Sequence, residues 1–177
     1  MYTELFNRKK QHVPIAYLLA MLLCIFTTSC NDEDDIEAIF SGQTWYLGDF
    51  YHTSNWKDDN NQKAVYSRNP EAMKMIIANG RNRFYITFQE KTFTARGTGN
   101  TFSGTWSADG KTNELHINIT QGNPSHGSGL EQEITRKFYD YIKSGKFYRG
   151  NTIWLKFFPE DRKSFMQLTK NRIENPQ

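Results

Sequence analysis

The chain has 177 residues, of which 37% are hydrophobic and 15% aromatic, and 22 basic against 19 acidic side chains leave a net charge of +3. This length suits one domain, and the aromatic content excludes a disordered, collagen-like or coiled-coil chain. Residues 1–29 hold three bases, Arg8, Lys9 and Lys10, and one acid, Glu4. Without them the charge is nearly balanced, which argues against a nucleic-acid partner bound through electrostatics.

An apolar run of 14 residues, 13–26, follows these bases. It is shorter than the roughly 20 residues that span a bilayer. It fits the ~7–15 residues of a signal-peptide core behind a basic segment. The alternative is a buried N-terminal helix, but such a helix is normally amphipathic and this run is apolar on all sides. We therefore expect residues 1–29 to be a signal peptide.

The run ends at Thr27-Thr28-Ser29-Cys30, which resembles a bacterial lipoprotein signal peptide cut just before a lipid-modified cysteine. Thr27 departs from the leucine that is more usual three places before that cysteine. The resemblance implies a multiply acylated Cys30, which anchors the mature chain stably in a membrane. Because Cys24 would leave with the signal, the mature domain would have no disulfide and no thiolate metal site.

An acidic run follows the cysteine, and it consists of Asn31, Asp32, Glu33, Asp34 and Asp35. Its charges predict a solvated, extended tether. An acidic run in this place is also similar to the surface-export signal of Bacteroidetes lipoproteins, which implies an outer-membrane protein exposed at the cell surface. An anchor that faces the periplasm remains the alternative. We assign residues 30–39 to the lipidated cysteine and tether, 40–170 to a folded domain and 171–177 to a C-terminal tail.

Alternating apolar and polar residues, typical of strands, dominate the chain after Ile36. Strands are expected at 44–47 with a continuation to Phe50 and Tyr51, and at 83–88, 92–96, 102–106, 115–119, 152–158 and 164–169. Asp109-Gly110 and residues 159–163 are expected to form hairpin turns. The polar stretch 52–68 is predicted to be a long loop.

Two segments carry helix signals. Asn69 offers a cap and Pro70 suits the first helical position, with Gly80 as a possible end, although a buried strand remains an alternative within 70–79. Apolar residues from Leu130 to Ile142 recur at helical spacing. We expect an α+β, β-rich fold, in which a curved antiparallel sheet or small barrel of about six to eight strands carries one amphipathic helix.

Three features of the domain carry a family resemblance. They are the glycine-rich segment Gly97-Thr-Gly-Asn-Thr-Phe-Ser-Gly-Thr-Trp106, the Asp109-Gly110 turn, and Tyr148-Arg-Gly-Asn-Thr-Ile-Trp-Leu155 after the helix. They resemble META-domain envelope lipoproteins and the lipocalin-like lipoproteins of Bacteroidales, over residues 40–168. The resemblance implies a fold of that kind but no catalytic site. META domains often carry a cysteine beside the asparagine, and here Asn100 precedes Thr101, so no disulfide is inferred.

Residues that could carry chemistry form no recognisable motif. In the Gly97–Asn100 segment the third glycine of a phosphate-binding loop is misplaced, no Lys-Ser/Thr follows, and the next predicted element is a strand. His52, His116 and His126 lack the i, i+4 spacing of helical metal ligands, and Ser125-His126 does not match the nucleophile elbow of hydrolases. We therefore expect no catalytic residue, no metal, no cofactor and no enzymatic activity.

The aromatic residues provide one candidate binding patch. Trp45, Trp106 and Trp154 lie in predicted strands, where core packing is expected. Trp56 lies in the polar loop instead, so its indole either stacks on a sugar or a partner surface or folds back as a hydrophobic anchor. Tyr51 leads into this loop, which makes Tyr51 and Trp56 the candidate ligand-binding residues.

Two functions remain open at this level. In the first, the domain is a non-enzymatic module that binds a small apolar or glycan ligand in the mouth of its barrel at the cell surface. In the second, it is a structural or interaction lipoprotein that acts through an envelope protein partner. An aromatic-lined cavity of ~300 Å³ or more would support the first, and a barrel filled with side chains would support the second.

Overall fold

The computed structural model describes residues 35–78, 81–124 and 128–170. The predicted signal peptide, Cys30, the acidic residues 31–34, the Ser125-His126 pair and the tail 171–177 lie outside the described residues. Within the described ranges, no helix is both long enough and apolar enough to cross a membrane.

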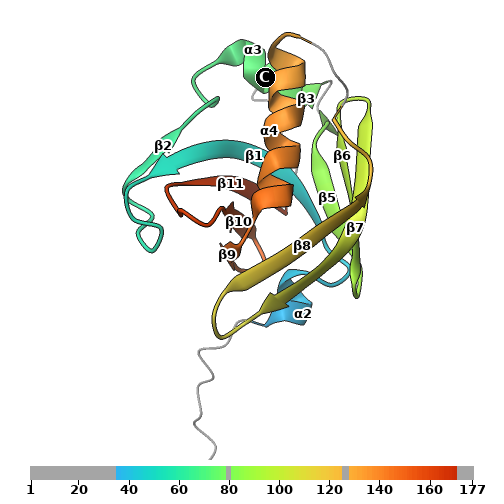
Figure 1. Cartoon of the computed structure of the whole chain (residues 1–177). Helices are drawn as coiled ribbons and strands as arrows, with labels where there is room; N and C mark the ends of the chain where they lie inside the picture. Colours follow the sequence, from blue (N-terminus) through green and yellow to red (C-terminus); the bar gives the residue numbers. More distant parts are fainter. Residues whose placement is uncertain (1–34, 79–80, 125–127, 171–177) are drawn as a thin grey trace, which may run out of the picture. The chain divides into compact units, whose positions relative to one another are not determined.

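A nine-stranded antiparallel sheet curves into a ring (Figure 1). Its order is β11-β10-β9-β8-β7-β6-β5-β1-β2, and β11 also pairs with β1, which closes the ring. The strands are β1 (Thr44–Thr53), β2 (Gln62–Ala64), β5 (Tyr85–Phe88), β6 (Thr92–Gly97), β7 (Asn100–Asp109), β8 (Glu114–Gln121), β9 (Phe147–Gly150), β10 (Trp154–Phe158) and β11 (Ser164–Thr169). The predicted fold class is confirmed, with nine strands in place of six to eight.

Strand β1 closes the ring because it pairs with β5 along one edge and with β11 along the other. Its first residues pair with β5, and its last residues pair with the short strand β2. Its other edge pairs with β11 from Tyr46 to His52. A separate short ladder joins β3 (Ile77–Ala78) to β4 (Arg81–Asn82).

Within the described residues three helices accompany the sheet, and the sequence carried signals for the second and third of them: α2 (Ile36–Ile39), α3 (Pro70–Ile76) and α4 (Leu130–Ser144). Helix α2 begins at Asp35, whose carboxylate accepts the Ala38 N–H, and its Ile39 is buried. Residues 36–39 of the expected tether therefore belong to the fold. Helix α3 begins with Asn69 as its cap, as predicted, and leads directly into β3. Residues 70–78 are thus a helix followed by a strand.

Helix α4 packs its apolar face on the barrel, as its spacing predicted. Its buried residues are Ile134, Thr135, Phe138, Tyr139 and Ile142. The Phe138 ring lies edge-on to Phe84 with centroids 5.5 Å apart, and Tyr139 meets Phe102 of β7 at 4.9 Å. An ion pair of 2.7 Å between Arg83 and Glu131 secures the beginning of the helix.

Aromatic side chains fill the interior of the ring. The Phe40 ring, which follows α2, stacks on Trp106 at 4.8 Å and meets Phe88 and Tyr148 edge-on, each at 5.1 Å. Phe88 also contacts Phe157 of β10 at 6.2 Å. The exposed fraction of each of these side chains is 8% or less. Among the described residues, the barrel is therefore solid at this end.

The hairpin between β7 and β8 forms where Asp109-Gly110 predicted it, but its backbone differs from the expected one. The Asp109 carboxylate accepts the N–H groups of Lys111 and Thr112. The positive φ of the turn, 58°, belongs to Asn113 and not to Gly110. Asparagine tolerates this left-handed conformation better than most residues do.

Candidate functional site: an aromatic layer outside the barrel

The two predicted binding residues lie on the outer face of the barrel, over β1, β9, β10 and β11. Successive side chains of a strand point to opposite faces. In β10, Leu155 and Phe157 join the interior core, which directs Lys156 and Phe158 outward. We call the aromatic residues gathered on this outer face the outer layer. Its members are Tyr51, Trp56, Phe147, Phe158 and Phe165.

The rings of the outer layer form one continuous chain of contacts. Tyr51 stacks on Phe165 with centroids 4.9 Å apart and planes 8° apart. Phe165 contacts Phe158 at 5.1 Å, and Phe158 meets the Trp56 indole at 5.6 Å. Trp56 also lies 5.9 Å from Phe147. The structure thus brings Tyr51 and Trp56 together in one layer, with the half-buried Trp56 folded back onto the barrel.

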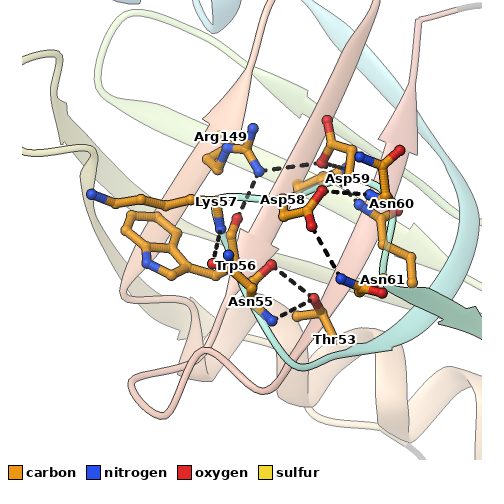
Figure 2. A network of polar contacts seen from close by, with 11 residues as sticks. Thr53, Asn55, Trp56, Lys57, Asp58, Asp59, Asn60, Asn61 and Arg149 are labelled. Atoms are coloured by element: carbon orange, nitrogen blue, oxygen red, sulfur yellow. Dashed lines mark hydrogen bonds and ion pairs between the residues drawn. The ribbon is translucent and has the colours of Figure 1, made fainter.

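Residues 53–61 are held over this layer by their own hydrogen bonds (Figure 2). The Thr53 hydroxyl donates to the Asn55 carbonyl at 2.9 Å and accepts the Asn55 N–H at 3.2 Å. The Asn61 amide donates to the Asp58 carboxylate at 3.1 Å. Arg149 of β9 ties the segment to the barrel because its guanidinium donates to the Trp56 carbonyl at 2.6 Å.

An ion pair between a buried lysine and a half-exposed carboxylate attaches the same segment to the barrel. The Lys156 side chain is 5% exposed, and its ammonium donates to the Asp59 carboxylate at 2.7 Å. The ammonium also lies 4.8 Å from the ring centroids of both Trp154 and Phe165. The hydrogen bond from the Lys156 ammonium lowers the pKa of the Asp59 carboxyl below its usual range, and the positive charge of Arg149, 3.2 Å from the carboxylate, lowers it further.

Arg162 covers part of the outer layer. Its backbone has a positive φ of 55°, at the turn between β10 and β11. The guanidinium lies 3.7 Å from the Phe147 centroid and 4.5 Å from the Trp56 indole. Both distances are typical of cation–π contacts. One face of the Trp56 ring is therefore occupied by a residue of the chain itself.

Asp49 secures the segment that returns to the barrel after β2. Its carboxylate is buried and accepts N–H groups from Phe50 at 2.7 Å, Tyr66 at 3.0 Å and Ser67 at 2.6 Å, together with the Ser67 hydroxyl. Burial raises the pKa of the nearby Tyr51 phenol, and the Asp49 charge raises it further. The role of this carboxylate is structural, because backbone and hydroxyl donors satisfy it.

A polar hollow of about 440 Å³ lies at the surface beside the outer layer. Hydroxyl, amide and basic side chains line it, from His52, Thr53, Ser54, Asn60, Asn61, Gln62 and Lys63. No aromatic ring of the outer layer is part of this lining. Of the remaining predicted residues, His116 is exposed on β8, 3.9 Å from Glu114. Within the described ranges, no three His, Cys, Asp or Glu residues gather as a metal site would require.

Comparison with known proteins places the chain in a family. Residues 31–170 match a domain of unknown function named DUF4847. The chain belongs to the DUF4847 family. A crystal structure of a DUF4847 family protein from Bacteroides vulgatus is 30% identical, has a TM-score of 0.64, and is matched over 78% of this chain and 99% of its own.

More distant comparisons show only the fold. An NMR structure of a protein from Burkholderia xenovorans is 11% identical with a TM-score of 0.52, over 80% of this chain and 90% of that one. The curated proteins contain no match to the chain. The resemblance to META-domain and lipocalin-like lipoproteins stays a prediction beside the DUF4847 membership.

Proposed function

We infer that this DUF4847 chain is the precursor of an outer-membrane lipoprotein, anchored through Cys30 and exposed at the cell surface, which acts through its outer surface on a protein partner of the envelope. The Thr27–Cys30 pattern and the acidic run 31–35 support the anchoring and the export. A family relative from Bacteroides vulgatus agrees with the kind of organism in which that export signal is used.

The filled interior is the observation that favours a partner over an enclosed ligand. Phe40, Trp106, Tyr148 and Phe88 occupy the space that a barrel-bound ligand would need, and each is buried. Eight strands close the ring, and a barrel of that size is either filled by its own side chains or holds one small ligand, so the buried aromatic rings distinguish the two cases. What the domain offers to other molecules is therefore its surface.

A small glycan remains a second candidate because of the polar hollow over residues 52–63. Its hydroxyl and amide lining suits the hydroxyl groups of a sugar bound in a shallow, open depression of the surface. A glycan in this place would lie on the surface over residues 52–54 and 60–63, and not in the mouth of the barrel.

Mass spectrometry of the mature protein, purified from its own host, tests both parts of the proposal. Under denaturing conditions the mass should exceed that of residues 30–177 by the acyl chains. A Cys30→Ala variant should lack this lipid, and lipid retained by the variant would contradict the anchor. Under native conditions no further small molecule should be present. A reproducible adduct that is lost on denaturation would contradict the partner proposal and support a binding module.

A further inference from the structure

One edge of strand β8 has no strand partner over most of its length. Its other edge pairs with β7 from Glu114 to Gln121. On the open side, β9 pairs with it only at Glu114, where the Leu115 N–H donates to the Lys146 carbonyl at 2.9 Å. Beyond Leu115, no strand within residues 35–78, 81–124 and 128–170 joins this side of β8.

The open edge presents backbone hydrogen-bonding groups. In an antiparallel strand, the N–H and C=O of alternate residues point to the same side. Because the Leu115 N–H points toward β9, the groups of Ile117 and Ile119 point to the open side as well. Neither residue has a backbone hydrogen bond on that side within the part of the chain that the structure describes. An edge of this kind is a template for an added strand.

A hollow of about 210 Å³ lies along the first part of this edge. Residues 115–118 of β8 and 105–107 of β7 line it, together with Lys143 in the last turn of α4 and Gly145 and Lys146 just after the helix. Ile117 lines this hollow and is half-buried, and Ile119, which is also half-buried, lies beyond it on the same strand. The hollow can therefore receive side chains of an extended segment that pairs with the edge.

The positive charge beside the hollow favours an acidic partner segment. Lys143 and Lys146 are exposed at the hollow, and no carboxylate among the described residues forms an ion pair with either one. A second copy of the chain, paired antiparallel through β8, would bring the neutral Thr120 and Gln121 toward these lysines. A partner segment with carboxylates at these positions is the better complement.

We propose that the open edge of β8 binds an extended, acidic segment of the partner protein as an added strand. Its backbone pairs with Ile117 and Ile119, its acidic side chains contact Lys143 and Lys146, and its apolar side chains fill the hollow. This inference rests on the proposed function and specifies the chemistry of the partner.

The test uses the mature lipoprotein in detergent micelles and a defined probe, a nine-residue peptide of alternating Glu and Val with blocked ends. Residue-resolved hydrogen exchange is measured with and without the peptide. We expect the amides of Ile117 and Ile119 to exchange at least about tenfold more slowly in the complex, because they gain hydrogen bonds. The amides of His116 and Asn118 should change little, since they already face β7. The same peptide with N-methyl groups on alternate residues should give no protection.

Two pairs of protein variants separate the backbone and charge contributions. Ile119→Pro removes the open-edge N–H without removing a bond to β7 and should abolish binding, whereas Ile119→Ala should retain it. The double variant Lys143→Glu, Lys146→Glu should weaken binding at least about tenfold. The matched double variant Lys57→Glu, Lys63→Glu, which changes the net charge equally on the 53–64 segment, should not.

Three results would overturn the inference. The first is the absence of protection at about 1 mM peptide, because a dissociation constant above that concentration is too weak for a specific complex. The second is equal binding of the N-methylated peptide. The third is protection that rises with protein concentration in the absence of peptide, which would indicate that a second copy of the chain occupies the edge. Each leaves the proposed function standing, because a small-molecule adduct in native mass spectrometry is what would contradict that function.

Discussion

At the scale of single residues, Lys156 and Asp59 form one of the contacts that attach residues 53–61 to the barrel. The two members of this ion pair differ in their access to water. The Lys156 side chain is 5% exposed, and that of Asp59 is 49% exposed. Removing one member therefore has a different cost from removing the other, because an unpaired buried charge is destabilising whereas an exposed carboxylate remains hydrated.

Asp59→Asn should accordingly destabilise the protein more than Lys156→Met. Asp59→Asn leaves the ammonium among aromatic rings, at a cost of about 1–3 kcal/mol. Lys156→Met keeps most of the packed stem, and the loss of a half-exposed pair costs about 1 kcal/mol or less. Denaturant unfolding of both variants measures the free energy of unfolding. Equal losses, or a larger loss for Lys156→Met, would contradict this description of the pair.

The pH dependence of the same pair follows from the lowered pKa of Asp59. Because the pKa of the Asp59 carboxyl is lowered in the folded state, its charge stabilises the fold at every pH above 3.8, the usual pKa of this group. This stabilisation is lost as the pH falls from 3.8 through the lower pKa of the folded state. The wild type should lose this part of its stability on acidification, and Asp59→Asn should not show it.

The sequence predicted some of this site. Tyr51 and Trp56 were expected together because a short stretch of chain connects them. The Lys156–Asp59 contact joins residues 97 positions apart and was missed. Its signal was the lysine within the otherwise apolar stretch Trp154–Phe158.

At the scale of elements, strands β7 and β8 approach each other closely at Gly104. A Cβ there would lie 1.9 Å from the Asn118 carbonyl oxygen, next to the register shift between Ser103 and Gly104. Gly104→Ala should therefore separate the strands locally and lower stability by about 3 kcal/mol.

A matched substitution at Gly99 provides the control for that prediction. Gly99 has a φ of +68° and no neighbouring atom within 4 Å of a Cβ. Asparagine tolerates this conformation, so Gly99→Asn should change stability far less. Thermal unfolding and hydrogen exchange of the β7–β8 amides measure both variants. Full stability of Gly104→Ala would show that the two strands are not held this closely.

Elements with strong periodicity were predicted correctly, and short ones were not. Strand β11 occupies the expected residues 164–169, and α4 spans the expected apolar repeat. Strand β2 has only three residues and strand β9 only four, so neither is long enough to show an alternation of apolar and polar side chains. Helix α2 is one turn long, and only Asp35 as its cap marked its beginning.

At the scale of the whole domain, the ring depends on contacts that a sequence does not display. Its closure pairs β1 with β11, whose residues are more than a hundred positions apart. Whether such a barrel is hollow depends on aromatic side chains from β5, β7, β9 and β10 and on Phe40, which follows α2. The sequence therefore predicted a barrel-like sheet but did not decide whether its interior is hollow or filled.

The central claim is that this interior is solid, and benzene binding tests it most directly. Phe138→Ala opens a space beside Phe84, and such an apolar cavity binds benzene and is stabilised by it. Leu168→Ala, on β11, is a second variant if the first folds poorly, since losses of about 3–5 kcal/mol are expected for Phe→Ala. Benzene should raise the melting temperature of the variant and leave that of the wild type unchanged. A comparable rise in the wild type would contradict the account, because it would reveal an existing apolar cavity.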